Sequence, residues 1–407
     1  MTSPDDVSSQ GIDQPPPQGF VVQFRRSVTH DSGLLCYLST RFAPPPESQL
    51  NRQRNMRRIS SIRTAHATGA EFDDSVSVDD LRALTKQPRL RVLQCSAPVR
   101  DAVWSRVNEH FCAARPDVVL RVYGSYSSEW DLTFARLLPN VRRFAVDCLL
   151  RATGVEALAE LRDLESLSLG IFDLTDFSVL GQLSPVLKSL SLGATRSKRP
   201  TLEPLRNFRS LRVLHLEGHS KGIDVLNELP ELEDVTLRSI TTPDLQYLAR
   251  LPKLRSLDIK LGGIRGFAGI EGKESIRYLE LWQVRNLRSV VVIGTLRGLQ
   301  NLFLQSLPHV GSLPRLTDLK VLRRIVVENL KGLSDFTALE TAPALEEFAL
   351  LDGRKQTPQQ ILPVLRNPSV RRVSAGFCSD RKNNEFSHLR EEHGKAEFGT
   401  RETFDYQ

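Results

Sequence analysis

The chain has 407 residues, of which 40% are hydrophobic and 25% are charged, and its formal net charge is +7. A single globular core stops growing well below this length, so we expect several domains or an elongated repeat array. No apolar run approaches the ~20 residues that a membrane-spanning helix needs, which argues against a membrane-spanning protein. The five cysteines are odd in number and lack CxxC spacing, which favours reduced thiols in a cytosol over a disulfide framework.

The N-terminal part of the chain differs in composition from the rest. Residues 1–19 are polar and proline-rich, so we expect them to be disordered, and they contain no pattern typical of a secretory signal. Alternating apolar residues at 20–42, around a His-Asp-Ser-Gly turn, predict a β-hairpin. A basic stretch follows a proline-rich break, and residues 59–64 at its end are a candidate for a degenerate first repeat strand. We predict that residues 20–89 form a hairpin and cap region, either docked on the rest or as a separate small domain.

The body of the chain repeats one short pattern: a leucine, two variable residues, a leucine, one variable residue and another apolar residue. Seven clean copies lie 21 to 24 residues apart, and they begin at Leu164, Leu187, Leu211, Leu232, Leu254, Ile276 and Leu299. Weaker copies continue the period upstream to Leu90 and downstream to Val370. This fixed spacing predicts about thirteen stacked repeats over residues 90–376.

Each copy of the pattern alternates apolar and variable residues, as a short strand with one buried face does. The second half of a repeat carries apolar residues at helical spacing, as in 244–254 and 335–345. Asp176, Asp335 and the Thr242-Pro243 pair stand where helix starts are expected. We therefore predict an α/β solenoid with a parallel, concave β-sheet and a convex side of helical or 3-10 segments. Residues 377–407 are predicted to cap its last coil, with Phe377, Phe386 and Phe398 covering the apolar end.

These repeats resemble the leucine-rich-repeat superfamily, in particular its short-period, internalin-like class. Segments 172–183 and 330–345 are most similar to that class, and the resemblance covers about 70% of the chain. It implies a curved solenoid that is used mainly for protein–protein recognition.

One feature of the family is missing from this sequence. The resemblance implies an Asn or Cys three residues after the last strand leucine, where its side chain binds backbone groups of neighbouring coils. Here those sites are Phe172, Thr195, His219, Ile240, Gly262, Val284, Leu307, Leu330 and Gly353. Without an Asn ladder, the coil corners must satisfy their backbone hydrogen bonds in another way.

The candidate binding residues are the variable positions of the middle strands, because alternate strand residues point away from the core. They are small in the early copies (Ser166, Ser168, Gly170, Ser189, Ser191, Gly193) but large and functional further on. The predicted site comprises His215, Glu217, Asp234, Arg238, Asp258, Lys260, Tyr278, Glu280, Trp282, Asn301, Phe303 and Gln305. Exposed aromatic residues ringed by charges are typical of a protein-binding hot spot. The alternative is that these charges pair across strands, Asp258 with Arg238 and Glu280 with Lys260.

Other functional patterns are weak. The sequence contains no GxxxxGK[ST], GxGxxG or GxSxG motif, and His388 and His393 are five residues apart, which prevents them from sharing a metal ion on one helix face. Arginine pairs at 142–143, 323–324 and 371–372 would form a basic rim, but no aromatic residues are interleaved with it as nucleic-acid binding requires.

We therefore predict a cytoplasmic, bacterial, non-enzymatic protein that needs no cofactor or metal and binds a protein partner on its concave face. The partner would be captured near Trp282, with Tyr278 and Phe303 as apolar anchors. Two alternatives remain open at this stage. One is a delivered bacterial effector whose N-terminal segment is an export signal, and the other is an anion or nucleic-acid binder that uses the arginine-rich rim.

Overall fold

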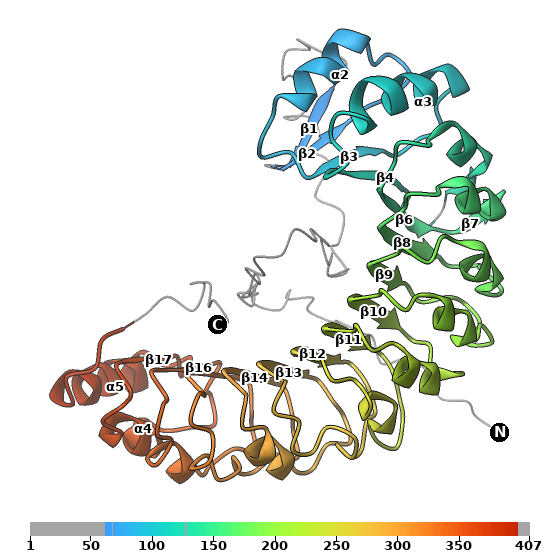
Figure 1. Cartoon of the computed structure of the whole chain (residues 1–407). Coiled ribbons are helices and arrows are strands. Elements are labelled where there is room, and N and C mark those ends of the chain that lie inside the picture. Colours follow the sequence, from blue (N-terminus) through green and yellow to red (C-terminus); the bar gives the residue numbers. More distant parts are fainter. Residues whose placement is uncertain (1–61, 67, 127, 398–407) are drawn as a thin grey trace, which may run out of the picture.

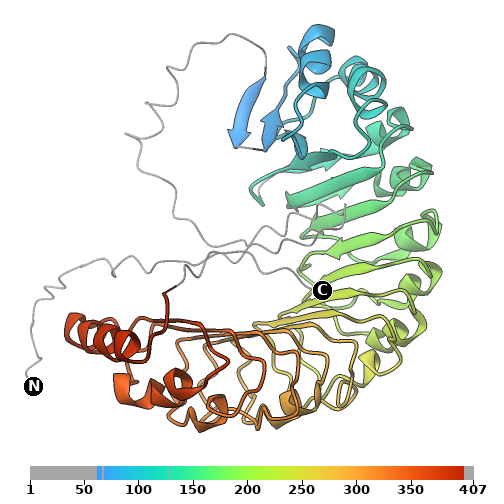
Figure 2. The same cartoon turned by 60° about the vertical axis from the view of Figure 1, so that its left-hand side comes forward.

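The structure is a computed structural model that describes residues 62–66, 68–126 and 128–397. It is a curved solenoid in which the strands line the inner side and short helices line the outer side (Figures 1 and 2). The predicted α/β solenoid with a concave parallel sheet is thus confirmed. The hairpin predicted at 20–42 and the disorder predicted for 1–19 lie outside the described residues.

One 15-stranded sheet runs through the described residues, with its strands in chain order. Its strands are β1 (Arg63–His66), β2 (Gly69–Glu71), β3 (Val92–Cys95), β4 (Val119–Tyr123), β6 (Arg143–Leu149), β8 (Ser166–Ile171), β9 (Ser189–Leu192), β10 (Val213–Glu217), β11 (Asp234–Arg238), β12 (Ser256–Lys260), β13 (Tyr278–Trp282), β14 (Asn301–Gln305), β15 (Arg324–Glu328), β16 (Glu347–Leu351) and β17 (Arg372–Ala375). All neighbours pair in parallel except β1, which runs antiparallel to β2. Strands β3 to β17 of this sheet begin within the copies of the repeated pattern that start between Leu90 and Val370.

The N-terminal edge of the sheet differs from the prediction. Residues 59–64 were expected to form a degenerate repeat strand, but β1 begins at Arg63 and forms an antiparallel pair with β2. The reason is the short connection between β1 and β2, which allows a hairpin and leaves no room for the crossover that a parallel pair needs. Residues 59–61 lie outside the described part of the chain.

The core lies between the sheet and the convex segments. Strand residues Leu214, Val235, Leu257, Leu279 and Leu302 are paired in register across five neighbouring strands, and each is at most 1% exposed. Burying one such side chain stabilises the fold by about 1.5–3 kcal/mol before entropy is counted. No coil could bury its leucines without the coils on either side of it, so stacking is what stabilises the array.

The convex side consists mainly of single 3-10 turns, because a coil of 21 to 24 residues leaves little room for a longer helix after its strand. The segments are α2 (Val78–Thr85), α3 (Asp101–Val107), the π-helix η1 (Asn108–Cys112), η2 (Thr133–Leu137), η3 (Val155–Glu160), η4 (Ser178–Gln182), η5 (Glu203–Asn207), η6 (Ile223–Glu228), η7 (Gln246–Leu248), η8 (Val291–Thr295), η9 (Thr337–Leu339), η10 (Pro358–Ile361), α4 (Leu362–Arg366) and α5 (Asp380–Glu392). No helix among the described residues is both long and apolar enough to cross a membrane.

The predicted helix starts have mixed outcomes. The carboxylates of Asp176 and Asp335 accept hydrogen bonds from the backbone N–H groups two residues further on, at 2.8 and 2.9 Å. The start predicted at Thr242-Pro243 is wrong, since η7 begins at Gln246 and the carboxylate of Asp244 accepts its first N–H at 3.0 Å. Pro243 therefore lies before the helical turn and not inside its start.

The coil corners replace the missing Asn ladder with a ladder of left-handed residues. In six consecutive coils the residue after the strand has a positive φ of 50–79° (Gly218, Ser239, Leu261, Gln283, Ser306, Asn329). Each of these residues donates its backbone N–H to the carbonyl group at the end of the next strand, at 2.7–2.9 Å. The neighbouring family positions are free to be apolar, as at Ile240, Val284 and Leu307, which are buried. His219 is the exception, because its Nε2 bonds the carbonyl oxygen of Gly193 at 3.1 Å.

The C-terminal end of the solenoid is closed by α5. Phe377 and Phe386 are at most 2% exposed, and their ring centroids lie 5.7 Å apart. After α5 the chain returns to the sheet, where Ala396 forms a parallel bridge with Arg372 of β17. Phe398, the third predicted capping residue, lies outside the described residues.

Candidate functional site

The concave face presents three rows of outward-pointing side chains, and strands β10 to β14 carry most of its large polar and aromatic groups. All twelve predicted site residues lie on these five strands. The first row contains Asp234, Tyr278 and Asn301; the second row contains His215, Asp258, Glu280 and Phe303; the third row contains Glu217, Arg238, Lys260, Trp282 and Gln305. The parallel register sets residues of one row side by side on neighbouring strands. The sheet therefore brings the predicted residues together on one surface.

The charges on this surface are paired across strands. Lys260 Nζ lies 3.0 Å from Glu280 and 3.5 Å from Asp258, so one ammonium group lies between two carboxylates. The predicted pair of Glu280 with Lys260 is confirmed. The predicted pair of Asp258 with Arg238 is wrong, because Arg238 donates to Glu217 at 2.9 Å. Both of these residues are in the third row and directly opposite each other, whereas Asp258 is in the second row.

Trp282 lies at the end of β13, beside two cations. The guanidinium carbon of Arg238 is 6.0 Å from its ring centroid, and Lys260 Nζ is 5.9 Å away. Its indole Nε1 is buried and has no hydrogen-bond acceptor among the described residues. A buried N–H without an acceptor costs free energy.

Two aromatic residues that were expected to be exposed are buried. Tyr278 and Phe303 are each 6% exposed. The Tyr278 hydroxyl donates to Glu280 at 2.9 Å, and Phe303 packs against Val326 and Ala349. Both side chains therefore offer little exposed surface to a partner. Trp282 remains the partly exposed aromatic residue of the predicted set.

Burial shifts the protonation of several of these groups. Desolvation, together with the nearby charges of Lys260 and Arg238, lowers the pKa of His215 to about 4, so this imidazole is neutral at pH 7. Desolvation, followed by repulsion from Asp258, raises the pKa of Glu280, while Lys260 and Tyr278 oppose that shift. On the next strands, desolvation and the charge of Asp352 raise the pKa of Glu328 to about 7.

Strands β8 and β9 carry only small outward-pointing side chains beside this charged area, as the sequence indicated. Ser166, Ser168 and Gly170 of β8 lie beside Ser189, Ser191 and Gly193, which belong to or directly follow β9. A Cβ atom added at Gly193 would come within 3.2 Å of the Gly170 backbone, so these coils are closely stacked. The outward-pointing side chains of the concave face are therefore small on β8 and β9 and larger from β10 onward.

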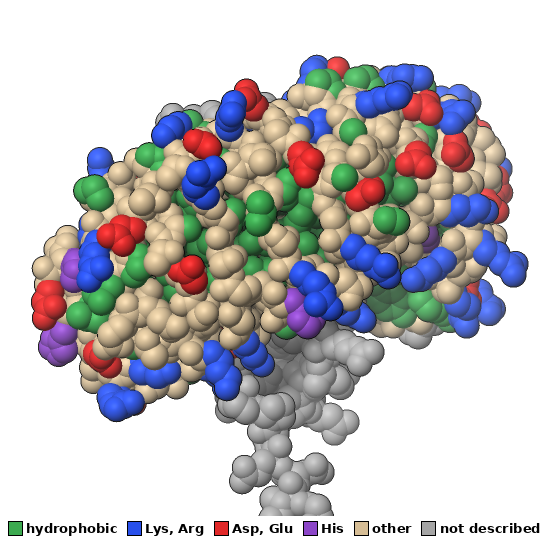
Figure 3. All heavy atoms as spheres, turned by 90° about the horizontal axis from the view of Figure 1, so that it is seen from below, with side chains coloured by type: hydrophobic (Ala, Val, Ile, Leu, Met, Phe, Trp, Pro, Cys, Tyr) green, Lys and Arg blue, Asp and Glu red, His purple; other side chains and the backbone are tan. Residues whose placement is uncertain are grey.

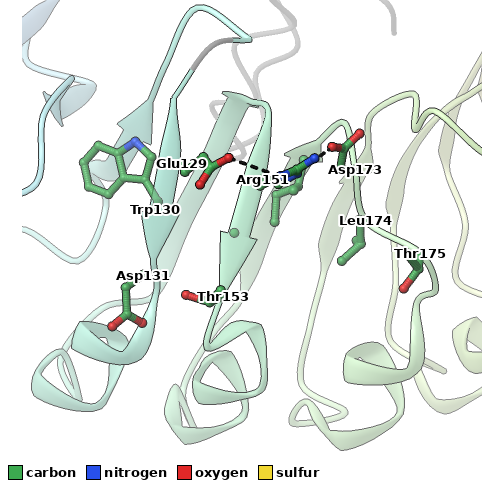
Figure 4. A pocket seen from close by; sticks show the side chains of 10 residues that line it. Glu129, Trp130, Asp131, Arg151, Thr153, Asp173, Leu174 and Thr175 are labelled. Carbon is green, nitrogen blue, oxygen red and sulfur yellow. Dashed lines mark hydrogen bonds and ion pairs between the residues drawn. The ribbon is translucent and has the colours of Figure 1, made fainter.

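A pocket of about 400 Å³ lies at the flank of the sheet, and no pattern in the sequence predicted it. It is formed by the two-stranded sheet of β5 (Glu129–Asp131) and β7 (Arg151–Thr153), and Figure 4 shows the ladder of charges beside it. Arg151 is 3.4 Å from Glu129 and 2.9 Å from Asp173, and Asp173 also binds Arg196 at 2.5 Å. Its charged groups already neutralise each other, which leaves no activated acid or base there.

Four of the six arginines in the arginine pairs form ion pairs with carboxylates on a neighbouring coil. Arg142 is 3.4 Å from Glu165, Arg323 is 3.1 Å from Glu346, and Arg324 and Arg372 both pair with Glu347. On the face of the molecule shown in Figure 3, basic and acidic side chains are interspersed. Acidic partners within the described residues therefore neutralise part of the predicted basic rim.

Features that would indicate catalysis are weak in the part of the chain that the structure describes. No group of three or more His, Cys, Asp or Glu side chains there could hold a metal ion. His388 lies within α5 and His393 at its C-terminal cap, and the latter bonds the carbonyl oxygen of Leu389 at 2.8 Å.

The period, the parallel concave sheet and the stacked leucines define a leucine-rich-repeat solenoid. Comparison with solved structures agrees. An internalin (InlF) from Listeria monocytogenes str. 4b F2365 is similar with a TM-score of 0.51 and 18% sequence identity, over 77% of this chain and 87% of the internalin chain. TLR13, in a complex with ssRNA13, is similar with a TM-score of 0.50 and 16% identity, over 77% of this chain and 48% of the receptor chain. At these identities the likeness shows the fold. No protein-family model and no curated protein sequence matches the chain.

Proposed function

We propose that this protein is a non-enzymatic recognition protein that binds a protein partner on the concave face between β10 and β14. The observation that carries the proposal is the position of Trp282, a partly exposed indole beside Arg238 and Lys260 with a buried N–H that lacks an acceptor. Tryptophan and arginine are enriched among the residues that dominate binding energy at protein interfaces. The fold supports the same use, because a solenoid offers an extended concave surface for recognition.

The partner's chemistry follows from the charges around the indole. Glu217, Asp258 and Glu280 alternate with Arg238 and Lys260, so no single sign of charge dominates the surface. Such a surface favours a partner with both acidic and basic side chains and disfavours a polyanion. An apolar side chain of the partner would cover the exposed part of the Trp282 ring.

The free state of the cysteines supports a cytoplasmic location. Four cysteines among the described residues are free (Cys95, Cys112, Cys148, Cys378), and the first two are buried. Burial raises the pKa of both buried thiols, which keeps them protonated and unreactive. This pattern is typical of proteins that work in a reducing compartment.

The proposal is tested by affinity capture with the wild-type chain, Trp282→Ala and a control, Val291→Ala. Val291 is an exposed valine of η8 on the convex side, 70% exposed, and its truncation leaves the concave face unchanged. We expect the wild type and the control to recover the same protein and Trp282→Ala to recover at least about tenfold less. Equal recovery by all three variants would refute the concave site. Recovery of nucleic acid that falls steeply with added salt would favour the anion-binding alternative instead.

A further inference from the structure

The third row of the concave face stays accessible beyond Trp282. Trp282, Gln305, Glu328 and Leu351 occupy successive positions of this row on β13 to β16, and each of them is partly exposed. The second-row residues of β14 to β16, by contrast, are at most 6% exposed. A partner that covers the Trp282 ring would therefore continue along the third row towards β16.

Glu328 differs from the other carboxylates of this surface because it has no cation. In the second and third rows of β10 to β15, the other three carboxylates each lie within 3.5 Å of Arg238 or Lys260. Glu328 forms no ion pair within the described residues, and the side chain of Gln305, its neighbour on β14, hydrogen-bonds to it instead. The third row thus offers one carboxylate whose charge is not compensated.

The charges that act on Glu328 are negative. Asp352, directly after β16, and Glu280 both repel its ionised form. Asp352 has its own cation, since Arg354 lies 2.6 Å away. Desolvation together with this repulsion raises the pKa of Glu328 to about 7. An ammonium or guanidinium group beside Glu328 would supply the missing opposite charge, whereas a carboxylate or phosphate group would add to the repulsion.

We propose that the protein partner presents a Lys or Arg side chain to Glu328 while an apolar side chain covers Trp282. This inference rests on the proposed function, because it takes Trp282 as part of the contact. Two strand spacings separate the two positions, which is about 10 Å. An extended segment advances roughly 3.3 Å per residue, so the basic and the apolar residue stand about two to four positions apart in it.

Selection from a phage-displayed library of random dodecapeptides on the full-length chain tests the proposal. The wild type should enrich peptides that carry Lys or Arg at this spacing from an aromatic or aliphatic residue. Glu328→Gln removes the charge but preserves the size of the side chain, so it should lose the enrichment of Lys and Arg and keep that of the apolar residue. Glu340→Gln is the matched control, because Glu340 is exposed at the end of η9 on the convex side. It should select the same peptides as the wild type.

The affinity of one selected peptide measures the contact itself. We expect its dissociation constant, determined by fluorescence anisotropy, to rise at least about tenfold for Glu328→Gln and to stay unchanged for Glu340→Gln. Replacing the basic residue of the peptide by Gln should weaken binding to the wild type by a similar factor. The same replacement should have little effect on binding to Glu328→Gln, because the two groups then no longer interact.

Two results would overturn the proposal. One is equal enrichment of Lys and Arg by the wild type and by Glu328→Gln, and the other is no enrichment of basic residues at this spacing by the wild type. The proposed function fails in a different way, namely if Trp282→Ala selects the same peptides as the wild type. If only Glu328→Gln does so, the site at Trp282 stands and recognition of a basic side chain at Glu328 is refuted.

Discussion

Lys260 of β12 and Glu280 of β13 form an ion pair of 3.0 Å in the middle of the concave sheet. Asp258 lies 3.5 Å from the same ammonium group, so Lys260 separates two carboxylates that would otherwise repel each other. All three side chains are at most 17% exposed, which makes this cluster the electrostatic centre of the candidate surface.

The first prediction concerns this cluster. Lys260→Met should destabilise the fold by about 2–3 kcal/mol, because it leaves two buried carboxylates without their shared cation. Glu280→Gln should lower the stability of the fold by less. The amide removes a charge that burial disfavours, and Lys260 retains its ion pair with Asp258. Urea denaturation followed by circular dichroism measures both. A larger loss for Glu280→Gln than for Lys260→Met would contradict this account of the cluster.

The second prediction is a pH dependence at Glu328. Its pKa is raised to about 7 in the folded protein from 4.5, so the folded state binds the proton more tightly than the unfolded state. This contribution to stability is present at low pH and is lost as the pH rises through the interval from about 4.5 to 7. After allowance for solvent screening of this partly exposed group, the loss is about 1–2 kcal/mol.

Glu328→Gln removes that titration. Urea midpoints measured at pH 5, 6, 7 and 8 should fall less steeply for this variant than for the wild type. Parallel curves for the two proteins would show that Glu328 titrates normally.

The third prediction concerns the corner ladder. Leu261 has a φ of 57°, a region that costs an ordinary residue roughly 1 kcal/mol and that Asn tolerates better. Leu261→Asn should therefore leave stability unchanged or raise it by up to about 1 kcal/mol. Gly218→Val, at φ 79° in the same ladder, should lower it by about 1–2 kcal/mol. Thermal unfolding midpoints measure both variants, and a midpoint that falls in Leu261→Asn but not in Gly218→Val would exclude backbone strain as the determining factor.

The fourth prediction concerns His219, which takes the place of the family's Asn. His219→Ala should cost about 1–2 kcal/mol, because the carbonyl oxygen of Gly193 loses its donor in a buried site. His219→Asn should recover much of that loss, since an amide can donate to the same carbonyl group. Ile240→Asn is the matched control at the equivalent position of the next coil, where the site is apolar and the amide should destabilise. If His219→Asn were as harmful as Ile240→Asn, the hydrogen bond would not be what His219 contributes.

The strands could be predicted from sequence because alternating leucines leave one register that buries them. The ion-pair partners were harder to predict, since each long side chain can reach several carboxylates: Arg238 pairs with Glu217 of its own row, whereas Lys260 reaches Asp258 and Glu280 of the second row. The burial of Tyr278 and Phe303 could not be seen either, because outward-pointing aromatic residues can still lie flat on their neighbours. The flank pocket arises from β5 and β7, which are three residues each and carry no repeat signal.

The central claim, that a protein partner binds the concave face, is tested most directly by site-specific photo-crosslinking. A benzophenone-bearing phenylalanine would replace Gln305, beside Trp282 in the third row, or Val291 on the convex side. The account predicts a protein adduct of defined mass from position 305 and none from position 291. An adduct from position 291 alone would place the partner on the convex side and contradict the account.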